Sequence, residues 1–297
     1  MHPFVFHNDR VLPIAQVRLS PGQAGLLNGW GLFSTVRVNE GIPFAWERHW
    51  NRLARDAGRI QLPLPHGPDA VREAIGRVIA ANNVQSACLR VYFVYNRVTM
   101  WHSDEPFPAV DLIIFSTDLP VREGPTQLTV MSDGRQAANP LTGTKVTAWL
   151  NNVWRAEQAH REGFEDAVLL NERGEVAECT AANLFCVQGK EVFTPPASSG
   201  CLLGVTREIL LEIGPKSGIP IAERPFSLSE LYRADEVFIS STTRNVQPVA
   251  CIAERAYPAI PGSVTERLAR LMSEYVRDYL RRHAAPSTGP PKPGGAL

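Results

Sequence analysis

The chain has only four lysines among its 30 basic residues, so chemistry that needs a lysine amine has few candidates. Lys190 and Lys216 lie in expected turns, and Lys292 lies close to the C-terminus. Lys145 differs, because small, hydroxyl-bearing and apolar residues surround it in the segment 141–150 and a helix is expected to follow. Burial there would disfavour the ammonium form, lower the pKa and leave an amine that can act as a nucleophile. An ordinary surface lysine ahead of a helix is the alternative.

Two segments have the composition of a phosphate-binding site. Gly204, Val205 and Thr206 stand where a helix is expected to begin, and the free N–H groups and dipole of a helix N-terminus attract phosphate. The run 240–243 follows an expected strand and offers hydroxyls and backbone amides in one bend. A plain helix cap or turn is the alternative for each segment.

Two charged side chains complete the set of chemical candidates. Glu178 lies among small and apolar residues, and a buried carboxylate needs a cationic or hydrogen-bond-donating partner. A protonated pyridine nitrogen would serve as that partner, and an arginine is the alternative. Arg52 shares a helix face with His49, three residues earlier, and its guanidinium could bind a phosphate with two hydrogen bonds. The alternative there is a solvated, arginine-rich helix.

The elements that must position these residues alternate between short strands and helices. Strands are expected at residues 4–6, 11–14, 32–38, 89–95, 112–115, 167–170, 184–187, 192–193 and 236–240. Helices are expected at 47–57, where Gly58 would end the helix, and at 71–79, 151–161, 206–213 and from Ser263 onward. Ser263 and Glu266 form a capping box for the last helix. Its inner face is expected to contain Leu268, Leu271, Met272, Tyr275 and Tyr279.

This mixture predicts an α+β fold of two domains rather than a doubly wound sheet. We expect a small α+β domain at residues 1–117, a larger one at 118–283 and a disordered tail at 284–297. The segment 118–125 carries two prolines and is expected to connect the two domains.

Composition excludes several functional classes. The 30 basic residues balance the 30 acidic ones, so nothing favours nucleic acid or an anionic membrane as a partner. No apolar run approaches the roughly 20 residues that a membrane-spanning helix needs. The five cysteines are odd in number and include no Cys-x-x-Cys pair, which argues against a disulfide framework or a zinc site and favours the cytoplasm.

The motifs resemble a known family when they are taken in order along the chain. They are Phe33-Ser-Thr-Val-Arg37, His49-x-x-Arg52-Leu53, Lys145, Glu178-x-x-x-x-Asn183-x-Phe185, Gly204-Val-Thr-Arg207 and Ser241-Thr-Thr followed by Pro248-Val249. This series, over about residues 4 to 280, resembles the class IV aminotransferases. That family includes branched-chain and D-amino-acid aminotransferases, R-selective amine transaminases and aminodeoxychorismate lyase.

The resemblance implies the two-domain fold type IV with pyridoxal 5'-phosphate (PLP) as cofactor. Lys145 matches the lysine that forms a Schiff base with PLP and shuttles the proton, and Glu178 matches the carboxylate on the pyridine nitrogen. Positions that bind the cofactor phosphate are matched by Arg52, Val205, Thr206 and Thr242. Positions in or near the substrate pocket are matched by Phe33, Arg37, Arg90, Arg97 and Thr243.

The sequence also departs from the family pattern. Many family aminotransferases have a tyrosine a few residues after the lysine, whereas this chain has Trp149-Leu150. The runs 33–37 and 178–185 look more like the lyase, while the run 241–243 looks more like the aminotransferases. The main hypothesis is an aminotransferase that moves an amino group between a 2-keto acid and a branched-chain-like L-amino acid, a D-amino acid or an R-amine. The alternatives are an aminodeoxychorismate lyase that releases pyruvate and a non-catalytic PLP-binding module.

The resemblance further implies an assembly of at least two copies. Family members close the pocket with neighbouring subunits, and a homodimer is the commonest such assembly. Pocket or interface walls could come from the aromatic residues Trp30, Phe33, Tyr92, Tyr95 and Trp101, with an ordinary core as the alternative.

Overall fold

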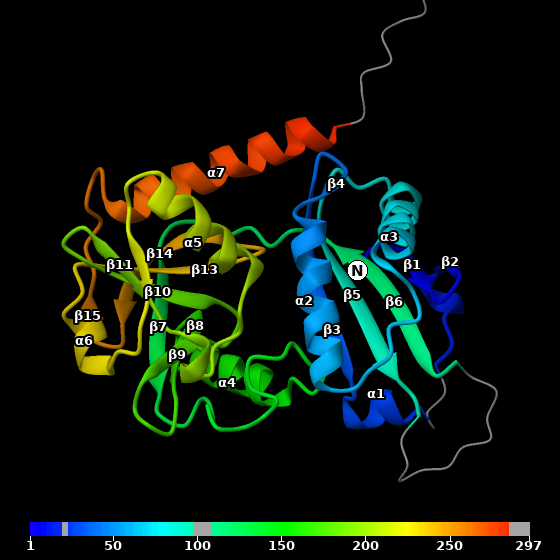
Figure 1. The fold of residues 1–297 in the computed structure, drawn as a ribbon, viewed down its shortest axis with the longest axis horizontal. Helices are drawn as coiled ribbons and strands as arrows, with labels where there is room; N and C mark the ends of the chain where they lie inside the picture. The colour runs from blue at the N-terminus through cyan, green and yellow to red at the C-terminus, as the bar shows by residue number, and fades with distance from the viewer. Residues whose placement is uncertain (20–22, 98–107, 285–297) are drawn as a thin grey trace, which may run out of the picture.

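The chain builds two β-sheets that lie side by side, in a computed structural model that describes residues 1–19, 23–97 and 108–284 (Figure 1). We refer to residues 1–117, which form the first sheet, as the N-terminal half. The C-terminal half is residues 118–284, which form the second sheet. The tail expected at 284–297 lies outside the described residues from 285 onward, and so does Trp101.

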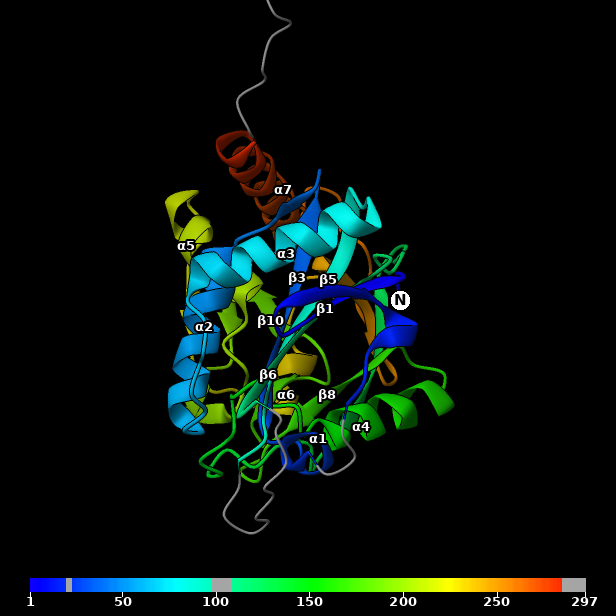
Figure 2. The ribbon, with the colours of Figure 1, turned by 90° about the vertical axis from the view of Figure 1, so that its right-hand side faces the viewer.

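The first sheet is antiparallel and has the strand order β2-β1-β6-β5-β3-β4. Its strands are β1 (Phe4–His7), β2 (Arg10–Pro13), β3 (Gly31–Asn39), β4 (Ile42–Pro43), β5 (Ser86–Tyr95) and β6 (Val110–Thr117). A 3-10 turn (Ile14–Gln16) and the short helix α1 (Ala24–Asn28) precede β3. Helices α2 (Trp46–Arg59) and α3 (Pro68–Asn82) pack against this sheet (Figure 2).

The apolar spacing of α3 shows why this packing forms. Val71, Ile75, Val78 and Ile79 recur at helical spacing, and all four are buried against the sheet. Each buried side chain of this size contributes roughly 1.5–3 kcal/mol relative to exposure. The predicted helix at 71–79 is therefore confirmed, and Pro68 extends it by one turn because proline fits the first turn of a helix.

The alternation of β3 separates two kinds of side chain. Leu32, Ser34 and Val36 are fully buried on the helix-covered face. Phe33, Thr35 and Arg37 alternate onto the opposite face and lie beside residues of β5 in the register Phe33–Tyr92, Thr35–Arg90 and Arg37–Cys88. The second face therefore carries the polar and aromatic side chains toward the other half of the molecule.

The second sheet is mixed and has the order β12-β11-β10-β13-β14-β7-β8-β9, with β15 paired to β14. Its strands are β7 (Thr126–Met131), β8 (Asp166–Leu170), β9 (Val176–Cys179), β10 (Asn183–Gln188), β11 (Glu191–Thr194), β12 (Ile221–Glu223), β13 (Glu236–Ser241), β14 (Asn245–Ile252) and β15 (Arg255–Ala256). Its helices are α4 (Leu150–Arg161), α5 (Val205–Lys216), α6 (Leu228–Tyr232) and α7 (Val264–His283), with a 3-10 turn at Ala197–Ser199. One of its two large apolar clusters contains Phe185 stacked on Phe238, with ring centroids 4.7 Å apart.

Two local predictions need correction. Helix α2 does not end at Gly58 but continues to Arg59, because its apolar face extends through Ala57 to Ile60 and one glycine costs a helix only about 1 kcal/mol. At α7 the Ser263 hydroxyl accepts the Glu266 N–H at 3.1 Å, as a capping box requires. The Glu266 carboxylate, however, accepts the N–H of Gly262 rather than that of Ser263, so the predicted capping box is only half formed. The inner face predicted for this helix is confirmed, since all five of its residues belong to one apolar cluster.

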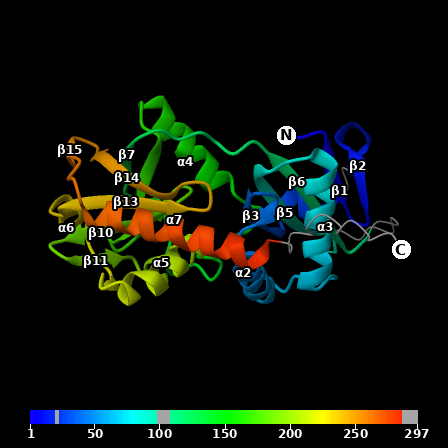
Figure 3. The ribbon, with the colours of Figure 1, turned by 90° about the horizontal axis from the view of Figure 1, so that it is seen from above.

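Helix α7 and helix α5 tie the two halves together. Arg48 of α2 donates to Glu208 and to Glu212 of α5, and the Tyr279 hydroxyl of α7 donates to Glu47 of α2 at 2.8 Å. In the view from above, α7 runs along the C-terminal half and ends over the N-terminal half (Figure 3). The predicted boundary after residue 117 falls between β6 and β7, which belong to different sheets. No helix among the described residues is long and apolar enough to span a membrane.

Candidate active site

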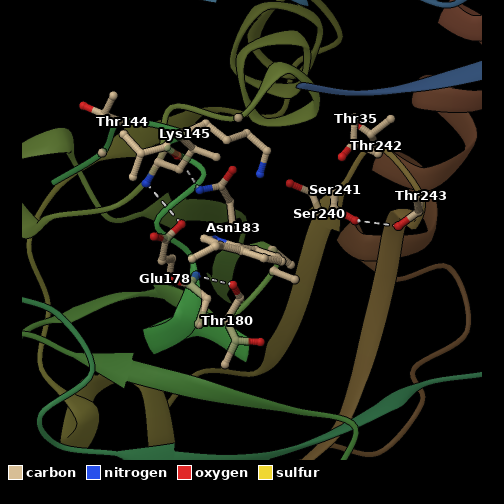
Figure 4. Close-up of a pocket in the computed structure, with 18 of the residues that line it drawn as sticks. Thr35, Thr144, Lys145, Glu178, Thr180, Asn183, Ser240, Ser241, Thr242 and Thr243 are labelled. Carbon is tan, nitrogen blue, oxygen red and sulfur yellow. Dashed lines mark hydrogen bonds between the residues drawn. The ribbon is translucent and has the colours of Figure 1, made fainter. Parts of the chain in front are cut away.

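A cavity of about 650 Å³ lies where the two halves meet. It is lined by residues of β3 and β5, of the segment 133–155, of the start of α5 and of the turn between β13 and β14. Among the predicted site residues it brings together Arg52, Arg90, Lys145, Glu178, Val205, Thr206, Thr242 and Thr243. In Figure 4, Lys145 and Glu178 lie on one side of this cavity, and Thr242 and Thr243 lie across from them.

The backbone around Lys145 is attached to the N-terminal half. The Lys145 carbonyl accepts the N–H of Phe33 at 3.0 Å, and the Lys145 N–H donates to the Asp56 carboxylate at 3.1 Å. Gly31 permits this close approach, since a Cβ there would lie 2.9 Å from the Thr147 hydroxyl and 2.6 Å from a backbone oxygen of β5. The sequence around the lysine therefore forms a fixed bridge rather than a free surface loop.

The environment of the Lys145 amine favours its neutral form. Its Nζ lies 4.4 Å from the centre of the Phe33 ring and 5.3 Å from that of Trp149, and although such rings attract an ammonium, the loss of water on burial has the larger effect. Burial, and then the positive charge of Arg52, lower the pKa of Lys145 from 10.5 to about 7. An amine with this pKa is available as a nucleophile and proton acceptor near neutral pH, which is the role that the sequence predicts for Lys145.

Arg52 and the start of α5 form an anion-binding cradle. Arg52 is buried, and its Nε has no hydrogen-bond partner among the described residues. The N–H of Glu208 is the first in α5 with a helical acceptor, so the N–H groups of Val205 and Thr206 precede it without one. A Cβ on Gly204 would lie 2.2 Å from the Asn183 side-chain oxygen, so only glycine allows this turn to pack there.

A hydrogen-bonded chain of buried side chains holds Arg52. Its guanidinium donates to the Ser34 hydroxyl at 2.9 Å, and that hydroxyl lies 2.9 Å from Nδ1 of His49. Burial, followed by the charges of Arg52 and Lys145, keeps the pKa of His49 well below its usual value. The imidazole is therefore neutral, and the Ser34 hydroxyl donates to its Nδ1 while it accepts from Arg52.

Glu178 has the arginine partner that the sequence left open as an alternative. Its carboxylate accepts from Nε of Arg135 at 2.9 Å and from the N–H of Leu202 at 3.1 Å. Both side chains of this ion pair are largely buried, yet both residues line the cavity. The two bonds fix the carboxylate in position at the edge of the cavity.

The remaining predicted residues are divided between three places. Arg37 lines a recess beside the cavity, and Thr243 lines both spaces. Phe33 lines neither, because it lies behind the Lys145 amine and stacks on Tyr92 at 5.3 Å. Arg97 is exposed and lines neither space; it directly precedes residues 98–107, which lie outside the described part of the chain.

Several residues of the site were not predicted from the sequence. They are Asp56, Arg135, Arg122, Arg155 and Arg244. Asp56 follows Arg52 by four residues on α2, and this spacing places both on one helix face, which is a signal in the sequence. Arg122, Arg135 and Arg244 lie in loops or turns and Arg155 lies within α4, and no local pattern distinguishes these four from the other arginines of the chain.

Comparison with known proteins identifies the family. Residues 31–252 match the family described as amino-transferase class IV. The chain belongs to the class IV aminotransferase family. This confirms the predicted family membership and makes the chain an enzyme of the aminotransferase class.

Three curated relatives of this class IV chain have different activities. A putative branched-chain-amino-acid aminotransferase of Methanocaldococcus jannaschii is 28% identical over 254 residues, which are 82% of this chain and 86% of the relative. A D-alanine aminotransferase of Listeria innocua is 28% identical over 255 residues, with 84% and 87% covered. An aminodeoxychorismate lyase of Bacillus subtilis is 25% identical over 283 residues, with 93% and 96% covered.

Solved structures confirm the predicted α+β fold type IV. The branched-chain amino acid aminotransferase of Escherichia coli superposes with a TM-score of 0.85 at 26% identity, covering 93% of this chain and 95% of that one. The fold is also shared with the T.th. branched-chain amino acid aminotransferase solved with pyridoxamine 5'-phosphate, at a TM-score of 0.84 and 24% identity, covering 95% and 97%.

Proposed function

We propose that this class IV aminotransferase binds PLP in the cavity between its halves and uses Lys145 to exchange an amino group between an amino acid and a 2-keto acid. The observation that carries the proposal is the Lys145 amine, whose pKa burial and Arg52 lower to about 7. It shares one cavity with a paired carboxylate and an anion-binding cradle. No other described lysine has comparable surroundings, because Lys190 and Lys216 are exposed.

The residues of the cavity fit the cofactor. Two buried polar atoms, Nε of Arg52 and Oγ of Ser240, have no hydrogen-bond partner in the described part of the chain and match the acceptors that a phosphate offers. With the N–H groups of Val205 and Thr206 and the hydroxyl of Thr242, they would hold the phosphate. Glu178, fixed by Arg135, would accept a hydrogen bond from the pyridine nitrogen. When bound, PLP supplies an electron-accepting ring that stabilises negative charge on the substrate.

The protein's own groups position the substrate and move its proton. Near neutral pH the Lys145 Nζ is partly deprotonated, so it accepts a proton from the carbon that carries the amino group and later returns one. Phe33 and Trp149 cover this amine and limit its contact with water. Arg90 and Thr243 line the same cavity and would bind the substrate carboxylate.

The test is a panel of amino donors given to the purified protein without an acceptor. L-amino acids, D-amino acids and R-amines are each mixed with the protein, and the visible absorbance band of the cofactor is followed. We expect one class of donor to bleach the band and a 2-keto acid to restore it. Lys145→Ala should abolish both changes, whereas Lys190→Ala, in the exposed turn between β10 and β11, should preserve them. A fully active Lys145→Ala variant would refute the proposal.

A second candidate function is the lyase reaction that releases pyruvate from aminodeoxychorismate. The match with the lyase of Bacillus subtilis covers 93% of this chain. This chain also has Trp149-Leu150 where many family aminotransferases have a tyrosine. Pyruvate released without any keto-acid acceptor would favour this function. Amino transfer that depends on an acceptor would favour the first.

We further propose a homodimer. Leu26, Leu27 and Trp30 are exposed at α1, and Leu150, Val153 and Trp154 are exposed at α4. These two groups lie on adjoining segments, since the Thr147 hydroxyl donates to the Gly29 carbonyl at 2.8 Å. An apolar patch of this kind typically marks a protein interface, and a symmetric second copy would cover it.

We also propose a cytoplasmic location. All five cysteines are free thiols, and four of them are buried, which suits a reducing compartment.

We further propose that residues 1–117 and 118–283 are two domains. The support is that their strands belong to two different sheets.

A further inference from the structure

Helix α2 lies on the side of the N-terminal half that faces the C-terminal half (Figure 1). Arg52, Asp56 and Arg59 recur along it at intervals of four and three residues, so their side chains leave the helix on one face. Arg52 belongs to the anion-binding cradle, while Asp56 and Arg59 contact the segment that carries Lys145. Sequence and family resemblance assign a role to Arg52 but none to Asp56 or Arg59. One helix face therefore connects the cradle to the lysine segment.

Arg59 holds the beginning of the lysine segment. Its Nη2 donates to the Pro140 carbonyl at 2.7 Å and to the Thr142 carbonyl at 3.0 Å. The chain then turns at Gly143, whose φ of 76° favours glycine over any other residue. The segment consequently has little conformational freedom before it reaches Lys145.

Asp56 holds Lys145 itself. Its Oδ2 accepts the Lys145 N–H at 3.1 Å, and on the other side the Lys145 carbonyl accepts the N–H of Phe33 at 3.0 Å. Asp56 is 1% exposed, so water does not compete for its bond to this N–H. The peptide groups on both sides of the lysine Cα are thus bound, and the side chain is the part of the residue that is left to move.

The second carboxylate oxygen of Asp56 has a cationic partner. Its Oδ1 accepts from Nε of Arg55 at 3.1 Å and from Nη2 of the same residue at 2.9 Å. The Arg55 side chain is half-exposed, so it balances the buried charge from the solvent side. With partners on both oxygens, the carboxylate has a fixed orientation, and Oδ2 points to the lysine backbone.

The charge of Asp56 acts on two cations of the site. The ionisable groups that interact with the Lys145 amine are Arg52, Glu178, Arg90, Asp56 and the neutral His49. Burial, and then the positive charge of Arg52, lower the pKa of Lys145, whereas the negative charge of Asp56 raises it. Burial also lowers the pKa of Arg52 to about 10, and the charge of Asp56 again acts in the opposite direction. One carboxylate thus stabilises the charged forms of both residues.

We propose that Asp56 is a positioning residue for the reaction, which holds Lys145 by its backbone N–H and supplies a negative charge that Lys145 and Arg52 share. The inference rests on the proposed function, in which the Lys145 amine accepts and returns the substrate proton. Such a transfer depends on the position of the amine, since a displacement of about 1 Å can lower a rate about 100-fold. Asp56 is not among the described residues that line the cavity, so it acts through Lys145 and not on the substrate.

The experiment compares three variants, purified with the cofactor bound. Asp56→Asn keeps an oxygen for the Lys145 N–H but removes the charge, and Asp56→Ala removes both. Glu73→Gln, at an exposed position of α3, is the matched control. Asp56→Ala should lower the kcat of amino transfer about 10- to 100-fold and leave KM nearly unchanged, because the amine is displaced while the substrate contacts remain. Asp56→Asn should recover most of this loss, and Glu73→Gln should match wild type.

A labelling measurement on the protein without cofactor makes the test independent of turnover. The protein is acylated with acetic anhydride over a range of pH, and each modified lysine is quantified by mass spectrometry, with the exposed Lys190 of the same sample as reference. The midpoint of Lys145 labelling should lie near pH 7 in wild type and in Glu73→Gln. It should fall in both Asp56 variants, because the negative charge that raises the Lys145 pKa has been removed.

The outcomes separate positioning from stability. Wild-type kcat in a folded Asp56→Ala, or an unchanged labelling midpoint in both Asp56 variants, would overturn the role of Asp56 alone. A purely structural Asp56 would lower Tm and leave the midpoint where it is in wild type, which also contradicts the proposal. Should Asp56→Ala fail to fold, the midpoint in Asp56→Asn decides. If wild type transfers no amino group from any donor, the proposed function fails, while the labelling midpoint still decides whether Asp56 acts on Lys145.

Discussion

Replacement of Lys145 by methionine should stabilise the protein once its cofactor has been removed. Burial, and then the positive charge of Arg52, lower the pKa of this lysine from 10.5 to about 7. A base whose pKa is lowered on folding binds fewer protons in the folded than in the unfolded state. The free energy of unfolding therefore rises with pH between about 7 and 10.5.

The size of the effect follows from the shift of the pKa. One unit corresponds to about 1.4 kcal/mol, so the charged lysine lowers the free energy of unfolding by about 4 kcal/mol at pH 7 and about 1 kcal/mol at pH 10. Water in the cavity screens part of this penalty, so these are upper values. Methionine has a similar length and no charge, so it removes the penalty at every pH.

The assay is urea unfolding of wild type and Lys145→Met at several pH values from 7 to 10, after dialysis to remove the cofactor. The variant should be more stable at pH 7, and its advantage should shrink by roughly 3 kcal/mol toward pH 10. Lys190→Met, at an exposed turn, should show no such trend. A difference between Lys145→Met and wild type that is constant with pH would refute the lowered pKa, whatever its sign.

Three further predictions follow from the site and the surface. Glu178→Gln should keep the cofactor bound but lose most of the rate at saturating substrate, about 10-fold or more, since a neutral hydrogen bond replaces a charge-assisted one; an unchanged rate would exclude the role. Ser34→Ala should weaken PLP binding about 2- to 10-fold in absorbance titrations, because the Ser34 hydroxyl holds Arg52 in place. Binding of pyridoxal, which lacks the phosphate, should not change. Equal weakening of PLP and pyridoxal binding would contradict a role of Ser34 in phosphate binding. Trp154→Arg should convert a dimer to monomers in light scattering, whereas Arg10→Gln, at an exposed position on β2, should not, and a dimeric Trp154→Arg would remove α4 from the proposed interface.

Sequence alone identified those features that depend on local composition. Lys145 could be distinguished because the other lysines lie in turns or near the C-terminus, and the run Gly204-Val-Thr predicted the helix start that α5 has. The alternation of β3 also predicts that Phe33 and Arg37 share a face. The local pattern did not show that Phe33 would lie behind the amine rather than in the cavity, since that depends on where Trp149 and Tyr92 pack.

Partners that are distant in the sequence could not be predicted in the same way. Arg135 reaches Glu178 across 43 positions, and Arg244 reaches Asp166 across 78. The residues next to Arg135 and Arg244 do not distinguish them from the other arginines among the 26 in the chain, so the sequence could not show which arginine pairs with which carboxylate. The choice of partner is made by the sheet order, in which β7 pairs with both β14 and β8, and β9 follows β8.

The attachment of Lys145 to the N-terminal half has a mechanical consequence. Its backbone is hydrogen-bonded to Phe33 and Asp56, so Lys145 is anchored to the N-terminal half, which also carries Arg52. Glu178 and Thr206 belong to the C-terminal half. A hinge motion between the two halves would thus pull apart the two groups of ligand-binding side chains, and a ligand that contacts both groups would hold the hinge closed. At 100 times its dissociation constant, such a ligand stabilises the closed arrangement by about 2.7 kcal/mol, so occupancy of the cavity and rigidity of the whole molecule are coupled.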